Sequence, residues 1–116
     1  GALSLAVQYY AKPEIVAIVP PNCFIPRPNV ASAVIRLTCH EKKPVEVKDE
    51  KGMFALIRAS FNQRRKTLAN SLSNAQNLSL TREQVTEALE SMQLSPTIRG
   101  EALTLEQFAA LADILL

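Results

Sequence analysis

The chain has 116 residues, of which 47% are hydrophobic and 21% charged, and its formal net charge is +2. This composition is typical of a folded, water-soluble domain and excludes a disordered chain. No apolar run approaches the ~20 residues that a membrane-spanning helix needs. The two cysteines, Cys23 and Cys39, form no CxxC pair and His40 is the only histidine, so a disulfide framework or zinc site has little support. We therefore expect a reducing, cytoplasmic setting and no membrane partner.

The first forty residues have the composition of β-strands. LSLAVQYYA is a nearly continuous apolar and aromatic run, EIVAIV follows the Lys12-Pro13 turn, and ASAVIRLT gives a third strand. Continuous apolar strands are typical of sheets that are buried on both faces. No helices accompany these strands to cover them, so residues 1–40 are predicted to be an incomplete part of a larger sheet. The start has neither a leading Met nor a basic segment, which argues against a signal peptide and suggests a cut end.

The stretch FIPRPNV, which precedes the third strand, contains Pro26 and Pro28. Proline fixes φ and cannot donate to a sheet ladder, so residues 25–29 are predicted to form a stiff extended loop. This loop would hold Phe24 at the mouth of the strand. A lone aromatic there usually fills a core, whereas a positioned ring can also be a stacking surface for a nucleobase. Composition leaves both interpretations open.

Residues 41–52, EKKPVEVKDEKG, are rich in lysine and acids, which predicts a solvated linker over 41–48 and a helix start near Asp49. The chain from residue 53 onward has helical periodicity. An unbroken first helix would place Arg64 in its apolar stripe, so we expect a break near Asn62-Gln63 and a second helix carrying RRKTLANSL. Asn74 to Asn77 is predicted to be a loop.

Two later helices are predicted to begin with the same cap. Thr81 and Gln84 fit a capping box, as do Thr104 and Gln107. A leucine precedes each threonine and an apolar residue stands at the fifth position after that leucine, as a hydrophobic staple requires. Ser95-Pro96 is predicted to end the first of these two helices. Residues 49–116 are thus predicted to be a small helical domain.

Residues capable of catalysis are hard to find. Only three glycines exist, so no glycine-rich turn can hold a nucleotide, and no carboxylate pair stands in the β part. Cys23 and Ser32 lack a plausible histidine base. Binding has better support: residues 53–73 carry four cations and no acid, whereas residues 74–116 carry two arginines against six acids. The run Gln63 to Thr67 offers the groups that contact phosphate oxygens, and a helix opening there would add free N–H groups. A solvated basic face is the simpler alternative.

The chain resembles the C-terminal part of the KsgA-type ribosomal RNA adenine dimethyltransferases. GALSLAVQYY matches the family's run into a strand, and CFIPRPNVASAV matches its Phe-x-Pro-x-Pro-x-Val-x-Ser-x-Val segment. FNQRRKTL followed by NSL matches its basic helical motif, and Arg99–Leu103 with Phe108–Leu111 match its closing helices. The resemblance covers essentially the whole chain in order.

The resemblance implies an α+β fragment. Residues 1–40 would be the last strands of a Rossmann-like S-adenosylmethionine methyltransferase sheet, 41–48 a linker and 49–116 an all-α domain. The parent enzyme would dimethylate N6 of adjacent adenines of 16S rRNA, and the all-α domain would help it dock on the small ribosomal subunit. Phe24 would pack against the flipped adenine. The RNA-contacting cations would be Arg27, Arg58, Arg64, Arg65 and Lys66.

The chain lacks several of the family's motifs. The glycine-rich S-adenosylmethionine loop, its acidic ribose-binding partner and the Asn-Leu-Pro-Tyr motif are absent from it. We therefore expect no catalytic, cofactor-binding or metal-binding residue here, and S-adenosylmethionine bound only by a preceding part of the parent. The fragment alone is predicted to be inactive. The alternatives are a freestanding basic helical RNA-binding or ribosome-assembly module, and a protein-interaction domain. Exposed strands predict some self-association in each case.

Overall fold

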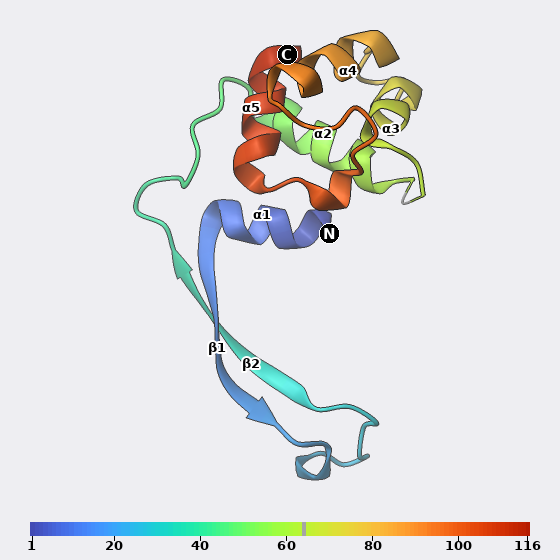
Figure 1. Cartoon of the computed structure of the whole chain (residues 1–116). Helices are drawn as coiled ribbons and strands as arrows, with labels where there is room; N and C mark the ends of the chain where they lie inside the picture. The colour runs from blue at the N-terminus through green and yellow to red at the C-terminus, as the bar shows by residue number, and fades with distance from the viewer. Residues whose placement is uncertain (64) are drawn as a thin grey trace. The chain divides into compact units, whose positions relative to one another are not determined.

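The computed structural model of the chain describes residues 1–63 and 65–116 (Figure 1). It contains two compact units, one formed by residues 7–44 and the other by residues 1–6 together with 45–116. The first is a β-ribbon unit and the second a helical unit, so the fold is a small α+β arrangement. The predicted functional division at 1–40, 41–48 and 49–116 stays a prediction. No helix in the described part of the chain is long and apolar enough to cross a membrane.

Residues 2–10 are helical, and the predicted strand LSLAVQYYA is wrong. These residues form helix α1 (Ala2–Tyr10). Leu5 and Tyr9 are buried, and Ala2 and Ala6 are partly buried beside them. These four positions have the i, i+3, i+4, i+7 spacing of one helical face. Uniform apolarity therefore concealed a helical period that was present in the sequence.

Two strands form a single antiparallel ribbon (Figure 1). β1 (Ala11–Val19) pairs with β2 (Ser32–Cys39), which confirms the second and third predicted strands. Ile15 faces Ile35 and Ala17 faces Val34, so the ladder is irregular at Val16. Because side chains alternate along a strand, the extra residue keeps Ile15 and Ile18 on one face of the ribbon.

The ribbon consequently has one apolar face and one mixed face. The register places eight residues without charge on the first face: Ala11, Pro13, Ile15, Ile18, Ala33, Ile35, Leu37 and Cys39. The second face carries Lys12, Glu14 and Arg36 among smaller residues, and Lys12 Nζ lies 3.6 Å from a Glu14 carboxylate oxygen. All residues of β2 are exposed, and so are most of β1. The described chain thus leaves uncovered the strands that the sequence predicts to be buried on both faces.

Besides the start of α1, the described part of the helical unit contains four helices and one short 3-10 turn. They are α2 (Glu50–Phe61), α3 (Leu68–Asn74), α4 (Arg82–Ser91), the turn η2 (Gly100–Ala102) and α5 (Leu105–Leu115). Helix α2 contacts α3, α5 and η2, and α4 contacts α3 and α5. The largest side chains fully buried in this unit are Met53, Leu56, Ile57, Leu68, Leu72, Val85, Leu89, Phe108 and Leu111.

The helix starts follow the predicted capping residues. The Asp49 side chain accepts from Gly52 N at 2.9 Å, so α2 begins where the sequence indicates. Both predicted capping boxes are confirmed, because Thr81 and Thr104 each exchange two hydrogen bonds with the glutamine three residues on. These bonds satisfy N–H groups that the first helical turn leaves without a partner.

The break after the first long helix is also confirmed, since α2 ends at Phe61. The second helix starts later than predicted: it begins at Leu68 and not within the basic run. Thr67 is its N-cap and accepts from Asn70 N, while Leu68 N donates to Ile98 O at 2.8 Å. These bonds occupy N–H groups that would otherwise be free at the start of α3. The predicted contribution of a helix start to anion binding is therefore not supported.

Helix α4 ends before Ser95-Pro96, at Ser91. Leu94 N donates to Leu89 O at 2.9 Å and Gln93 N donates to Glu90 O at 3.0 Å, which is a Schellman arrangement. Gln93 has φ of 61°, in the left-handed region where glycine is usual. The helix is thus closed by local hydrogen bonds before the proline is reached.

Candidate functional site

Phe24 lies in the connection between β1 and β2, which spans residues 20–31. The 3-10 turn η1 (Pro21–Cys23) comes first, and Phe24 N closes it by donating to Pro21 O at 3.2 Å. Phe24 then has an extended backbone and is 39% exposed. The residues that follow, up to β2, form no regular element. The ring is accessible in this chain.

Arg27 is exposed in the same connection, whereas the other candidate cations belong to the helical unit. Both cysteines are free and exposed. His40 Nε2 lies 2.9 Å from Gln8 O, and His40 N donates to Tyr10 O, so this residue has a structural role at the end of β2. Among the described residues, no three His, Cys, Asp or Glu side chains gather as metal ligands would.

The cations of the helical unit lie near the end of α2 and in the segment before α3. Arg58, Arg65 and Lys66 are all exposed. Arg64, the remaining predicted RNA contact, lies outside the described residues. Lys66 N donates to Gln63 O at 3.0 Å, and Asn74 Nδ2 donates to Gln63 Oε1 at 3.4 Å, which ties this segment to the end of α3.

Two adjoining hollows lie beside these cations. The larger, about 340 Å³, is lined by Ala2, Ala55, Arg58, Ala59, Phe61, Asn62, Ala75 and Asn77. The smaller, about 90 Å³, is lined by Ala59, Asn62, Gln63, Ser71, Asn74 and Ala75. They share Ala59, Asn62 and Ala75, and no described carboxylate lines either one. We call this surface the amide-cation face, defined by Arg58, Asn62, Gln63, Asn74, Asn77, Arg65 and Lys66.

The amide-cation face extends what the sequence predicts. Its side chains offer N–H donors and amide oxygens, which are groups suited to phosphate and sugar oxygens or base edges. The asparagines were missed as site residues at the sequence level. Asn62 follows Arg58 at the i, i+4 spacing of one helical face, which is a signal that could have found it. Asn77 had no such signal, because its position depends on how the chain returns after α3.

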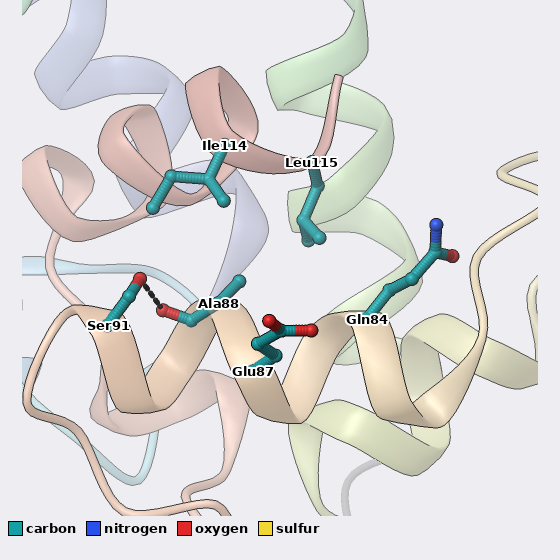
Figure 2. Close-up of a pocket in the computed structure, with 6 residues that line it drawn as sticks. All are labelled: Gln84, Glu87, Ala88, Ser91, Ile114 and Leu115. Atoms are coloured by element: carbon teal, nitrogen blue, oxygen red, sulfur yellow. Dashed lines mark hydrogen bonds between the residues drawn. The ribbon is translucent and has the colours of Figure 1, made fainter.

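The other charged surface of the helical unit is acidic and holds no predicted site residue. Figure 2 shows the groove between α4 and α5, where Glu87 and Gln84 of α4 face Ile114 and Leu115 of α5. The carboxylate of Glu87 in this groove would repel phosphates. The structure therefore separates cation and carboxylate clusters on different elements, as the uneven charge distribution in the sequence indicates.

Comparison with known proteins identifies the family. The sequence profile of the family described as "Ribosomal RNA adenine dimethylase" matches residues 1–115. The chain belongs to this family. It is 70% identical to the "Ribosomal RNA small subunit methyltransferase A" of Lachnoclostridium phytofermentans over 99% of the chain, and 50% identical to that of Streptococcus sanguinis. In both comparisons the chain spans 40% of the relative's length.

Two solved structures share the fold of this chain. The 23S rRNA methyltransferase ErmE matches with a TM-score of 0.67 at 21% identity, over 99% of this chain and 46% of that chain. A dimethyladenosine transferase from Plasmodium falciparum also gives 0.67, at 19% identity, over 96% and 46%. The resemblance noted in the sequence is thereby confirmed, together with the α+β fragment class.

The residues present do not fit an S-adenosylmethionine pocket. Gly52 lies within α2 and Gly100 packs against Ser60, so neither belongs to a turn that could close over a cofactor. The two hollows of the amide-cation face offer amides and cations but no described carboxylate to hold ribose hydroxyls.

Proposed function

We propose that the chain is the RNA-contacting C-terminal portion of an enzyme that dimethylates N6 of adjacent adenines of 16S rRNA in the cytoplasm. The observation that carries the proposal is the family match over residues 1–115, combined with 40% coverage of the small-subunit rRNA methyltransferases. S-adenosylmethionine would be bound by the part of the parent outside this chain. The 16S rRNA of the small ribosomal subunit would be its partner.

The apolar face of the ribbon supports this assignment. Ile15, Ile18, Ile35 and Leu37 are all more than half exposed. A two-stranded ribbon is at best marginally stable by itself in water. Burying each such side chain would stabilise the ribbon by about 1.5–3 kcal/mol, and this stabilisation is missing while the apolar face is uncovered. We infer that the rest of the parent's sheet unit covers this face, as a fragment of a larger catalytic domain requires.

In this proposal Phe24 forms one wall of the site for a flipped adenine. Its ring is accessible and its backbone is set by the turn η1, so little conformational freedom remains to be lost on binding. Stacking of a base on an aromatic ring is worth about 1–3 kcal/mol. Arg27, three residues on, would contact the RNA backbone beside it.

The amide-cation face would dock the enzyme on folded rRNA. Arg58, Arg65 and Lys66 would neutralise phosphates, and the amides of Asn62 and Asn77 would contact sugar or base edges in the hollow between them. Arg64 belongs to the same run in the sequence and is proposed as a further contact. Each cation that meets a phosphate releases counterions, so this docking would depend on salt.

A freestanding RNA-binding or assembly module without catalysis is the second candidate. One observation favours this second candidate: the helices of the helical unit bury a hydrophobic core of their own. The two candidates differ in what they predict for Phe24. A module that only docks on RNA has no use for a presented ring, whereas the enzyme fragment does.

The test is RNA binding by the full chain, measured by fluorescence anisotropy with a hairpin whose loop carries two adjacent adenines. Phe24→Ala should weaken binding by about 5- to 100-fold, which corresponds to the stacking energy of one base. Phe24→Tyr should retain affinity. The control is Ile25→Ala, because Ile25 is adjacent and fully exposed but is not aromatic.

If Phe24→Ala bound the RNA as tightly as the unchanged chain but was less stable, the ring would have a packing role. The freestanding docking module would then be the remaining candidate. The chain alone should show no saturable binding of S-adenosylmethionine in calorimetry. Tight saturable binding would contradict the division of roles between this chain and the rest of the parent.

A further inference from the structure

The groove between α4 and α5 is another hollow surface of the helical unit, and it lies outside the proposed RNA-docking face. It has a volume of about 310 Å³ and is lined by Gln84, Glu87, Ala88, Ser91, Ile114 and Leu115. In Figure 2 the side chains of Ile114 and Leu115 project from α5 toward α4, and Ala88 faces them. Ile114 is 51% exposed, and the adjacent Leu116 is 47% exposed. The groove therefore has an accessible apolar wall.

Glu87 is the carboxylate that lines the groove on its α4 side, and two further glutamates of α4 lie next to it. Glu83, Glu87 and Glu90 follow one another at helical spacing and are all exposed. Glu87 belongs both to this groove and to a neighbouring hollow of about 430 Å³, which Arg82, Glu83, Thr86 and Glu90 also line. No ion pair within 4.0 Å neutralises these three carboxylates in the described part of the chain.

Like charges at i, i+4 and i, i+3 repel one another along a helix. The row of three glutamates therefore weakens α4 in isolation, and a cationic partner would relieve that repulsion. The hydroxyl of Ser91 is already used, because it donates to Ala88 O at 2.7 Å. The groove thus offers an apolar wall and negative charge, with few neutral donors for a polar ligand.

We propose that this groove binds a basic amphipathic segment of a protein partner. An apolar side chain of the segment lies against Ala88, Ile114 and Leu115, and its lysines or arginines pair with Glu83, Glu87 and Glu90. RNA does not fit, because its phosphates would meet the carboxylate of Glu87 in the groove and those of Glu83 and Glu90 next to it. The chain's own basic run does not fit either, since the apolar residues of α2 beside it, Leu56 and Ile57, are buried.

The proposal goes beyond the proposed rRNA function and is independent of it. If RNA binding failed, the groove would keep its charge and its apolar wall. If both hold, the helical unit contacts RNA through the amide-cation face and a basic protein segment through α4 and α5. The ribosomal subunit offers both kinds of partner, because RNA-bound proteins commonly carry basic segments.

The test uses the full chain and a fluorescein-labelled amphipathic peptide of lysine and leucine, with a glutamate–leucine peptide of the same pattern for comparison. The lysine peptide should bind, and it should shift backbone amide NMR signals of residues 82–91 and 111–116. The glutamate peptide should bind at least tenfold more weakly. Ile114→Ser should weaken the lysine peptide severalfold, and it should leave the fold intact because the residue is half exposed.

The charge contribution is isolated with two variants of equal net charge. Glu83→Gln, Glu87→Gln and Glu90→Gln together should weaken the lysine peptide about tenfold, since each exposed pair contributes a factor of roughly two to five. The control combines Glu46→Gln, Glu101→Gln and Glu106→Gln, three exposed acids that line neither the groove nor the neighbouring hollow of α4. It should change the affinity less than twofold.

Equal losses in the two triple variants would show general charge attraction and overturn the proposal. Absence of lysine-peptide binding, or signal shifts confined to the ribbon, would do the same. A hairpin RNA that displaced the peptide from α4 and α5 would make RNA the occupant. Sedimentation in which Ile114→Ser abolished a dimer of the free chain would make a second copy the occupant.

Discussion

Gly100 lies where η2 meets the end of α2, and replacing it with alanine tests the packing of the helical unit. A Cβ at this position would stand 2.8 Å from Ser60 Cβ, 2.9 Å from Ser60 Oγ and 3.1 Å from Ser60 O. The first two distances are closer than non-bonded atoms approach, and the third involves backbone that cannot swing away. Ser60 is itself buried, and its hydroxyl donates to Ile57 O at 2.7 Å.

The expected loss of stability follows from two opposing terms. Overpacking of this kind destabilises by about 1–3 kcal/mol, and the lower chain entropy of alanine in the unfolded state returns about 0.4–1 kcal/mol. Gly100→Ala should therefore reduce the free energy of unfolding by about 1–2 kcal/mol, or lower the melting temperature by about 5–10 °C. Urea unfolding followed by helical circular dichroism measures it.

Measuring Gly100→Ala in a Ser60→Gly background separates the contact between residues 60 and 100 from other effects of the substitution. In Ser60→Gly the side-chain atoms nearest the new methyl group are gone, so the additional loss on adding Gly100→Ala should fall by at least half. Gly1→Ala is the control, because nothing lies within 4 Å of a Cβ at Gly1. An unchanged or raised stability for Gly100→Ala, or an equal loss in both backgrounds, would refute the close approach of η2 and α2.

Two further predictions concern the end of α4 and the ribbon. Gln93→Gly should raise the free energy of unfolding by up to about 1 kcal/mol, since Gln93 has φ of 61° and a non-glycine residue is disfavoured there; urea unfolding that shows a loss of stability would contradict the Schellman assignment. The double variant Ile18→Lys with Ile35→Lys should reduce self-association of the chain, measured by sedimentation, because both isoleucines lie on the exposed apolar face. The matched control is Ser32→Lys with Thr38→Lys, on the other face of the ribbon. An equal reduction in both double variants would show that the apolar face does not cause the self-association.

The sequence predicted the helical unit well because its boundaries are set locally. Asp49, Thr81 and Thr104 are caps whose hydrogen bonds reach only three residues along the chain. The break after Phe61 was predictable because a charged residue cannot lie in a buried stripe. The start of α3 was not, since it depends on Thr67 and on a hydrogen bond from Leu68 to the distant Ile98.

The β region was predicted less well, because apolar composition alone does not distinguish strand from helix. Residues 2–10 follow a helical period that uniform apolarity obscured. The irregularity at Val16 could not be predicted either, since a bulge is fixed by the partner strand. For the candidate site, the cations were visible as a run in the sequence. The asparagines that join them come from both sides of α3, and only the folded chain brings them together.

The salt dependence of RNA binding by the full chain tests the proposed docking face most directly. The variant Arg65→Ala with Lys66→Ala removes two exposed cations of the amide-cation face, and Arg82→Ala with Arg99→Ala removes two exposed cations elsewhere in the helical unit. Each lost phosphate contact should reduce the slope of log affinity against log salt by roughly 0.7–0.9. The first variant should therefore lower the slope by about 1.5 and weaken binding at least tenfold, while the second leaves both nearly unchanged. Equal slopes for the two variants, or an unchanged slope for the first, would contradict RNA docking through this face.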